Sequence, residues 1–281
     1  MIPAEFDYEA PESLEEAIRI LHENGDEAKL LAGGHSLLPL MKLRLAAPAL
    51  LVDLRRIPGL HGIQRENGNW RIGAMVPHAE IEHSPELGLA SRVAGKIADP
   101  QVRNRGTIGG SLAHGDPASD LPAVLLATEG TVTVQGPRGQ RTIAAADLFR
   151  DYLETALEQD EILTEVRLPA LDDFGFAYQK FTRRSEDWAM VGVSALVKRS
   201  GDTCEDVRVG LTNMASVPIR ASALEEALRG QPLDKDRIAA AAEQAAEGTD
   251  PPADLNASSG YKRHLARVLC HRALLEAAGV T

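Results

Sequence analysis

The sequence predicts an α+β fold built in three consecutive parts. Residues 1–57 show short apolar runs beside an amphipathic helical pattern, which indicates a small β/α unit. Residues 58–173 mix strand and helix patterns, and residues 174–281 carry strand patterns first and helical patterns afterwards. The chain has 281 residues, of which 44% are apolar, so it can bury a substantial core.

The first part is expected to begin with a helix. Ser13 and Glu16 have the spacing of a capping box, and Gly25 marks the end of the helix. Ser36 stands where it can cap a second helix, in the segment LLPLMKLRL. Short buried strands are expected at AKLLAG (28–33) and ALLVDL (49–54).

The other two parts follow from the same patterns. Val191, Val193, Ala195 and Val197 alternate as in a strand with one buried face, and ALDDFG (170–175) indicates a linker before the third part. The elements expected in the second part are strands at 69–76 and 161–169, helices at 86–98 and 121–127, and a hairpin at 131–143. Those expected in the third part are strands at 176–182, 189–199 and 205–213, then helices at 222–229, 236–247 and 261–278.

Composition and charge argue against several function classes. The chain has 30 Lys and Arg against 41 Asp and Glu, a net charge of −11, with only 4% aromatic residues, which argues against a nucleic-acid partner. No apolar run reaches the roughly 18 residues of a membrane span. The acidic start MIPAEFDYEAPESLEEA lacks the apolar segment of a signal peptide. These features predict a cytoplasmic protein.

The two cysteines, Cys204 and Cys270, are expected to be reduced and structural rather than bridged. Two thiols are also too few for an iron–sulfur cluster, which takes about four ligands. The sequence contains no H-E-x-x-H or C-x-x-C motif that would predict a catalytic metal. Rossmann, Walker A and nucleophile-elbow patterns are absent from it as well.

Two glycine pairs carry the strongest functional signal. Gly33–Gly34 lies in LLAGGHSLLP and Gly109–Gly110 in TIGGSLAHGDPASD, and hydroxyl residues stand beside both pairs. Backbone amides in such runs form nests that point N–H groups at an anion. A pyrophosphate would suit two such loops facing each other; the alternative is that each pair only forms a tight turn.

Asp116 and Asp120 allow three interpretations. Their spacing of four residues makes a cation site conceivable. One of them, or Ser119, is alternatively the N-cap of the helix that follows. Asp120 could also accept hydrogen bonds from ribityl or ribose hydroxyls, a role that is compatible with capping.

Three segments together resemble the flavin-binding medium subunits of the molybdenum hydroxylases, such as aerobic carbon monoxide dehydrogenase and xanthine dehydrogenase. They are AGGHS (32–36), TIGGSLAHGDPASDLPAVLLA (107–127) and FAYQKFTRRSEDWAMVGV (176–193). The resemblance covers nearly the whole chain. It implies a two-part FAD-binding domain of the vanillyl-alcohol oxidase (PCMH) type, followed by a separate C-terminal α+β domain.

The resemblance also implies which residues bind FAD, without a covalent bond. The first segment would wrap the diphosphate from one side and the second from the other. Asp120 would lie beside the sugar-like chain of the flavin, and Leu163 near its ring system. The residues implied in cofactor binding are Ala32, Gly33, Gly34, His35, Ser36, Thr107, Ile108, Gly109, Gly110, Ser111, Asp120, Leu163 and Lys180.

For four side chains the sequence leaves the role open. Lys180 matches a lysine near the flavin in the xanthine dehydrogenase branch, or it is a surface lysine. Trp188 packs near the isoalloxazine, or it is a core tryptophan. His35 and His114 are candidates for polar contacts, and neither is expected to be a catalytic base.

The function implied by the resemblance is that of an FAD-binding electron-transfer subunit of a molybdenum-containing hydroxylase or dehydrogenase. Molybdopterin and the [2Fe–2S] centres would lie on a large and a small partner subunit, in a dimer of heterotrimers. Electrons would pass from the [2Fe–2S] centres through FAD to an external acceptor, with no catalytic residue on this chain. The alternatives are a stand-alone flavoprotein oxidoreductase of the same fold and a flavin-free scaffold subunit.

Overall fold

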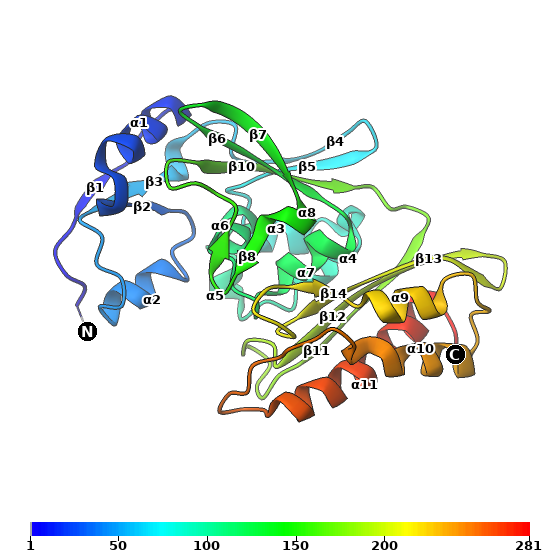
Figure 1. Cartoon of the computed structure of the whole chain (residues 1–281). Helices are drawn as coiled ribbons and strands as arrows, with labels where there is room; N and C mark the ends of the chain where they lie inside the picture. Colours follow the sequence, from blue (N-terminus) through cyan, green and yellow to red (C-terminus); the bar gives the residue numbers. More distant parts are fainter. Residues whose placement is uncertain (1) are drawn as a thin grey trace.

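The N-terminal lobe is a three-stranded parallel sheet, in the order β1–β3–β2, with α1 packed against it (Figure 1). The structure, a computed structural model, describes residues 2–281. Its elements in this lobe are β1 (Asp7–Glu9), α1 (Leu14–Asn24), β2 (Ala28–Leu31), α2 (Leu37–Lys42) and β3 (Leu50–Asp53). The two predicted strands and both predicted helices are present.

The start and end of α1 are as predicted. The Ser13 hydroxyl accepts a hydrogen bond from the Glu16 amide at 3.1 Å, and Gly25 ends the helix with φ +52°. Ser36 precedes α2, but its side chain makes no capping hydrogen bond, so that part of the prediction is wrong. The strand β1 was not predicted, because its three residues are all exposed and show no alternation.

The middle part is a five-stranded antiparallel sheet, in the order β4–β5–β10–β6–β7, with helices packed beneath it (Figure 1). The strands are β4 (Ile63–Glu66), β5 (Asn69–Gly73), β6 (Thr131–Gly136), β7 (Gly139–Ala144) and β10 (Ile162–Pro169), and β8 (Phe149–Asp151) and β9 (Glu154–Thr155) form a separate pair. The helices are α3 (His78–Glu82), α4 (Leu89–Ala94), α5 (Pro100–Arg103), α6 (Ile108–His114), α7 (Asp120–Ala127) and α8 (Ala145–Leu148).

Two predictions for this part need correction. The single helix expected over 86–98 is broken at Gly88, which has φ +55°, into a 3-10 turn at Pro85–Leu87 and the helix α4. The polar segment around Gly109–Gly110 is the helix α6 rather than an open loop. Glycine lowers helix propensity, but a Cβ on Gly109 would lie 2.6 Å from the Ala74 Cβ, so close packing requires glycine in this helix.

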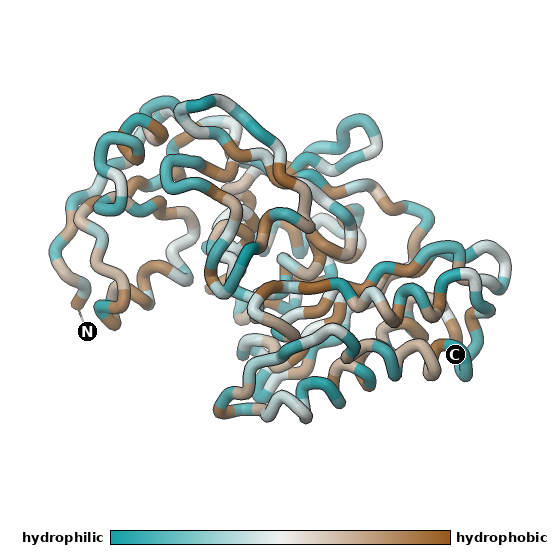
Figure 2. Tube along the Cα trace, viewed as in Figure 1, coloured by the Kyte–Doolittle hydropathy of each residue, from teal (hydrophilic) through white to brown (hydrophobic). Residues whose placement is uncertain are grey.

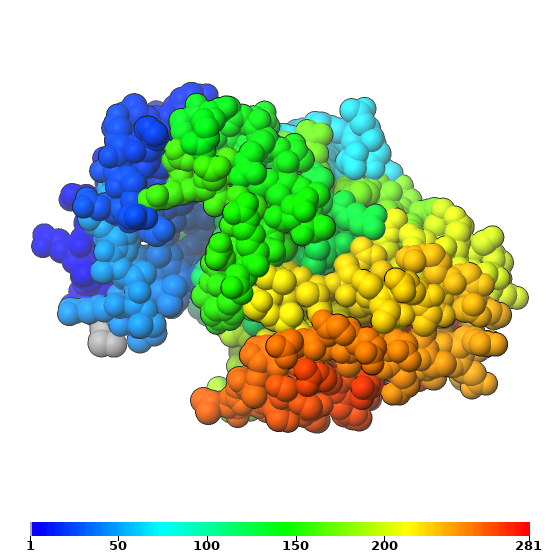
Figure 3. Space-filling model, in the orientation of Figure 1, coloured from blue at the N-terminus to red at the C-terminus, as the bar shows by residue number. Residues whose placement is uncertain are grey.

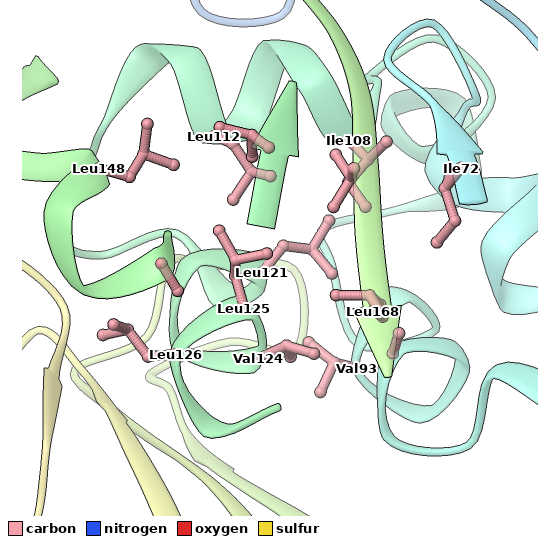
Figure 4. Packing of buried hydrophobic residues seen from close by; sticks show 14 of the residues in the cluster. Ile72, Val93, Ile108, Leu112, Leu121, Val124, Leu125, Leu126, Leu148 and Leu168 are labelled. Carbon is pink, nitrogen blue, oxygen red and sulfur yellow. The ribbon is translucent and has the colours of Figure 1, made fainter. Parts of the chain in front are cut away.

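The core of the middle part lies between the sheet and its helices. Figure 4 shows Ile108 and Leu112 of α6, Leu121 and Leu125 of α7 and Val93 of α4 converging beneath it. All five side chains are at most 2% exposed. Figure 2 shows hydrophilic residues at outer turns such as the one between β4 and β5, and hydrophobic residues along much of the interior of the middle part.

The C-terminal part is a four-stranded antiparallel sheet, in the order β11–β12–β13–β14, with α11 packed on β11 and β12 (Figure 1). Cys204 and Cys270 lie buried and unbridged in its core, as predicted. No helix within residues 2–281 has both the length and the apolar character to cross a membrane. The elements are β11 (Phe174–Phe181), β12 (Val191–Ser200), β13 (Thr203–Thr212), β14 (Ile219–Arg220), α9 (Ser222–Leu228), α10 (Lys235–Ala242) and α11 (Ser259–Ala278).

The middle and C-terminal parts meet where α7 packs against β12 and β13. A Cβ on Gly210 of β13 would lie 2.2 Å from the carbonyl oxygen of Ala123 in α7. Tyr178 and Leu196, from the C-terminal sheet, belong to the core of the middle part. The division at residues 57 and 173 stays a prediction, because the parts share core residues.

Gly210→Ala is expected to lower the free energy of unfolding by about 1–3 kcal/mol, as overpacking does, because the Ala123 carbonyl cannot rotate away. Gly260→Ala is the matched control: a Cβ there meets nothing within 4 Å, and the residue lies in α11. The control is expected to keep or raise stability, by up to about 1 kcal/mol. Urea unfolding of both variants checks this, and equal stability of the two would contradict it.

Candidate functional site

A cleft with a volume of about 780 Å³ opens between the N-terminal lobe and the middle part. Figure 3 shows the hollow between the lobe, in blue, and the middle part, in green. The volume lies within the range of about 300–1,000 Å³ that is usual for ligand sites. The predicted site residues that line the cleft are Ala32, Gly33, Gly34, His35, Ser36, Thr107, Gly109, Gly110, Ser111, Asp120, Leu163 and Lys180.

Ile108 is the one predicted site residue that does not line this cleft. Its side chain is 2% exposed and belongs to the core of the middle part. It is the first residue of α6, and its amide donates to the Val76 carbonyl at 3.1 Å. It therefore attaches α6 to the segment that follows β5.

The glycine loop at residues 32–36 offers a run of free backbone donors. The amides of Gly33, Gly34, His35 and Ser36 donate to no acceptor within residues 2–281. Gly34 has φ +80°, in the left-handed region that favours glycine. The Ser36 hydroxyl is not used to cap α2. Successive free amides of this kind are a site for an anion.

Gly33 has a second reason to be glycine. A Cβ there would lie 2.2 Å from the Arg105 carbonyl oxygen and 2.7 Å from the Gly106 Cα. Both neighbours are backbone atoms, so neither can turn away. Gly33 therefore sets how closely the glycine loop approaches the segment before α6.

The second glycine pair makes a different kind of wall, which corrects the expectation of a second nest. Thr107 is the N-cap of α6, and its Oγ1 accepts a hydrogen bond from the Gly110 amide at 3.1 Å. The amides of Ile108 and Gly109 donate at 3.1 and 2.9 Å to carbonyls just after β5. These donors are used within the protein, so this wall offers a smooth glycine surface and the Ser111 hydroxyl.

Asp120 lies at the first position of α7, is 5% exposed and does not cap the helix. Its Oδ2 accepts a hydrogen bond from Lys180 Nζ at 2.8 Å, and its Oδ1 accepts one from the Tyr178 hydroxyl. The Lys180 side chain is 8% exposed, so the surface interpretation is wrong. Asp116 Oδ1 accepts from the Ala118 amide at 2.8 Å and does not line the cleft.

The structure also bears on the capping interpretation and on the cation-site interpretation of this segment. The side chain of Ser119, the residue before α7, makes no capping hydrogen bond either. Within residues 2–281, no group of three or more His, Cys, Asp or Glu side chains is arranged to hold a metal ion. What remains for Asp120 is the role of a buried acceptor at the cleft.

The protonation of Asp120 and of Tyr178 is governed by their burial and by their hydrogen-bond partners. Burial raises the pKa of the Asp120 carboxyl, and the Lys180 ammonium and the Tyr178 hydroxyl counteract the rise. Burial, and then the Asp120 charge, raise the pKa of Tyr178 well above its usual value, so its hydroxyl stays a donor. Sequence reasoning missed Tyr178, although residues two apart in a strand share a face, which pairs it with Lys180.

His78 is a second cleft residue that sequence reasoning missed. It is 5% exposed, and its Nδ1 is buried without a hydrogen-bond partner in residues 2–281. Burial, followed by the charges of His35 and Arg103, lowers its pKa from 6.5 to about 4. A lone histidine after a strand carries no pattern that would have revealed this.

The rim of the cleft carries two large, exposed apolar side chains, and the acidic Glu186 and Asp187 precede one of them in the chain. Trp188 lines it and is 57% exposed, so it is not a core residue. Leu153, on the β8–β9 turn, also lines it and is 44% exposed. His35 and His114 both line the cleft. Inside, Leu163 is 4% exposed and lies beside a bulge in β10.

These features fit FAD. Free amides and hydroxyls at residues 33–36 suit a diphosphate, the buried Asp120 suits sugar-like hydroxyls, and Leu163 offers an apolar surface to a ring. The fold and the cleft define a two-lobed protein that binds a large, partly anionic cofactor.

Comparisons with known proteins agree with this definition. Residues 4–171 match the family described as "FAD binding domain in molybdopterin dehydrogenase", and residues 176–277 match "CO dehydrogenase flavoprotein C-terminal domain". The chain is 43% identical to the carbon monoxide dehydrogenase medium chain of Hydrogenophaga pseudoflava, covering 98% of this chain and 97% of that one. It is 39% identical to the nicotine 6-hydroxylase medium subunit of Paenarthrobacter nicotinovorans, covering 98% of each.

A solved structure is similar over the same length. Carbon monoxide dehydrogenase from Hydrogenophaga pseudoflava, in a form that lacks the Mo-pyranopterin moiety, matches with a TM-score of 0.97 and 44% identity over 99% of each chain. The chain belongs to the FAD-binding medium subunits of the molybdenum hydroxylases. It is a flavoprotein subunit of an oxidoreductase complex, as the resemblance implied.

The buried His78 is expected to make stability depend on pH. Its folded pKa of about 4 lies below the ordinary 6.5, so the unfolded chain binds the proton first and stability falls as pH falls between these values. Between about pH 6.5 and 4.5, wild type is expected to lose about 2–3 kcal/mol more than His78→Gln, at about 1.4 kcal/mol per pH unit. Denaturant unfolding of the FAD-free chain at both pH values measures the difference.

The control is His61→Gln, which removes an exposed imidazole and is expected to follow wild type. If His78→Gln loses as much stability as wild type over the same range, His78 is not held neutral by burial.

Proposed function

We propose that this chain is the electron-transfer subunit of its complex. FAD in the cleft supplies the redox chemistry, taking electrons from the [2Fe–2S] centres of a partner and giving them to an external acceptor. The observation that carries the proposal is the cleft itself, in which twelve of the thirteen implied cofactor residues meet. The task of this chain is then to hold the cofactor, tune its potential and leave an edge accessible.

The residues of the cleft divide this task. The free amides of Gly33, Gly34, His35 and Ser36 hold the diphosphate, with the Ser111 hydroxyl on the opposite wall. The buried Asp120 accepts from the sugar-like chain. Lys180 and Leu163 would hold the ring system, with Trp188 at the rim of the cleft. The cleft residues hold the cofactor by contacts alone, with no covalent bond.

The metal centres are proposed to lie on partners. Both cysteines of the chain are buried in the core of the C-terminal part, and no group of possible metal ligands occurs in residues 2–281. Relatives named for carbon monoxide and for nicotine align over their whole length, which supports a substrate pocket on another chain. We assign molybdopterin to a large subunit and [2Fe–2S] to a small one, with two such heterotrimers paired.

Two exposed apolar side chains at the rim support entry of electrons at the cleft. Trp188 and Leu153 are large, exposed and adjacent to the site. A stable partner contact buries about 800 Å² on each side, and such contacts favour aromatic residues. The rim is therefore the proposed place where the iron–sulfur subunit covers this chain.

Substrate-dependent reduction tests the proposal. The isolated full chain with FAD is expected to lose its absorption near 450 nm when dithionite is added and to keep it when the substrate of the complex is added. With the two partner subunits present, the same substrate is expected to bleach the band. Rapid bleaching of the lone chain by substrate would instead make it a stand-alone flavoprotein, and a folded chain that takes up no FAD would be a scaffold.

Gly110→Val tests the wall made by α6. A Cβ on Gly110 would lie 2.8 Å from Thr107 Oγ1 and 3.5 Å from the Ala32 Cβ, in the space between α6 and the glycine loop. FAD affinity is expected to fall at least tenfold, which is about 1.4 kcal/mol. FAD titration followed by flavin fluorescence measures it.

The control separates cofactor binding from a general loss of stability. Asp234→Ala removes the N-cap of α10, where Asp234 Oδ1 accepts from the Arg237 amide at 2.8 Å outside the cleft, at a cost of about 1 kcal/mol of stability. FAD affinity of this variant is expected to stay within threefold of wild type. Equal losses of affinity in both variants would show that lower stability, and not the blocked space at Gly110, weakens FAD binding.

A further inference from the structure

The turn that follows α4 is held by two cationic side chains from different elements. Lys180 Nζ, from β11, donates to the Lys96 carbonyl at 3.1 Å. Arg103 Nη1, from α5, donates to the Ile97 and Ala98 carbonyls at 3.0 and 3.2 Å. Three consecutive carbonyls are therefore drawn toward positive charge.

Arg103 is itself fixed from behind. Its Nε donates to Glu82 Oε2 at 2.7 Å, and the two side chains are 13% and 28% exposed. The planar guanidinium presents its donors in a rigid fork, so it fixes the carboxylate and the two carbonyls in one geometry, whereas the donors of a lysine rotate. Arg103 thus connects the end of α3 to the turn.

The turn has an unfavourable backbone conformation. Ala98 has φ +42°, in the left-handed region, which costs a residue with a side chain about 1–2 kcal/mol. Such a conformation persists only where surrounding interactions hold it. The hydrogen bonds from Arg103 and Lys180 are those interactions.

The position of the carbonyls determines where the amides point. The described peptide bonds are all trans, and in a trans peptide the C=O and N–H point in opposite directions. Since the Ile97 and Ala98 carbonyls point at Arg103, the amides of Ala98 and Asp99 point away from it. Neither amide donates to an acceptor within residues 2–281.

The free amide of Ala98 belongs to the cleft. Ala98 lines the cleft, whereas Arg103 does not, so the guanidinium lies behind the wall and the amide on its open side. Lys180 lines the cleft as well, and it uses two of its three donors, on Asp120 and on Lys96. The Lys180 ammonium is near this amide, because it binds the carbonyl of Lys96, two residues before Ala98.

We propose that Arg103 is a positioning residue that holds the Ala98 amide toward the flavin ring system. The inference rests on the proposed function, which places the ring at the Lys180 end. A hydrogen-bond donor held beside a cationic side chain favours the electron-rich, reduced state of a ring over its oxidised state. Arg103 therefore raises the midpoint potential without touching the cofactor.

Arg103→Gln and Arg103→Lys in the full chain test this, with the flavin midpoint potential as readout. Both variants are expected to lose at least tenfold of the preference for the reduced state, a fall of about 30 mV for a two-electron couple. The affinity for oxidised FAD is expected to stay within threefold, because the glycine loop is untouched. Arg92→Gln is the matched control: it removes one charge from α4, where Arg92 pairs with Glu276 at 2.9 Å, outside the cleft, and is expected to keep the wild-type potential.

Glu82→Gln is a second variant. It weakens the hydrogen bond that fixes Arg103 but leaves the arginine side chain present, so a smaller fall in the flavin midpoint potential is expected. A wild-type potential in Arg103→Gln and Glu82→Gln would overturn the proposal. A wild-type potential in Arg103→Lys alone would show that charge, not positioning, acts, and would overturn it too. The proposed function fails on a different result, a wild-type chain that binds FAD but takes no electrons from the complex.

Discussion

The contact between Gly33 and the backbone before α6 sets the distance between the two walls of the cleft. A Cβ on Gly33 would lie 2.2 Å from the Arg105 carbonyl, and one on Gly106 would lie 2.9 Å from the His78 ring. Gly106 also accepts a hydrogen bond from the His78 amide at 2.9 Å. The glycine loop of the N-terminal lobe thus contacts the backbone before α6, and that backbone contacts the His78 ring at the start of α3. Among residues 2–281, Nδ1 of His78 has no hydrogen-bond partner, so this packing leaves a buried polar atom unsatisfied by the protein.

The two glycine pairs are similar in sequence, but their backbone amides are free in the first pair and hydrogen-bonded in the second. In the first, φ +80° at Gly34 and the absence of acceptors within residues 2–281 leave consecutive amides free. In the second, the Thr107 cap and the carbonyls after β5 take the amides, and the lack of side chains is what matters. The glycine loop at residues 32–36 therefore presents free amide dipoles to a ligand, and the wall made by α6 lets a ligand approach its backbone closely. A ligand that bridges the two walls needs an anionic group on one side only.

The sequence predicts elements well where the apolar period is strong or a cap is present. α1, with Ser13 and Gly25, and β12, with its alternating valines, appear as expected. It fails where tertiary contact overrides local preference: α6 is a helix because Gly109 fits against Ala74. For Trp188 the sequence left a position near the flavin and a core position open, and its 57% exposure excludes the core. The glycine loops and the resemblance pointed to residues that line one cleft, and their role in binding FAD stays a prediction. Arg103 and His78 were missed, because their roles come from hydrogen bonds and burial between segments far apart in the chain.

The charge of the chain explains why the cleft relies on backbone donors. The chain carries a net charge of −11, and a diphosphate is an anion. Among the described residues lining the cleft, the lysines are Lys29 and Lys180, no arginine is present, and Lys180 is paired with Asp120. The acidic residues of the lining are Asp120, Glu158, Glu161, Glu186 and Asp187. The acidic side chains of the cleft therefore disfavour an anion, and the free amides at residues 33–36 favour one. Because such dipoles are fixed in direction, they favour an anion at one place rather than anywhere in the cleft, as the proposed function requires of a diphosphate.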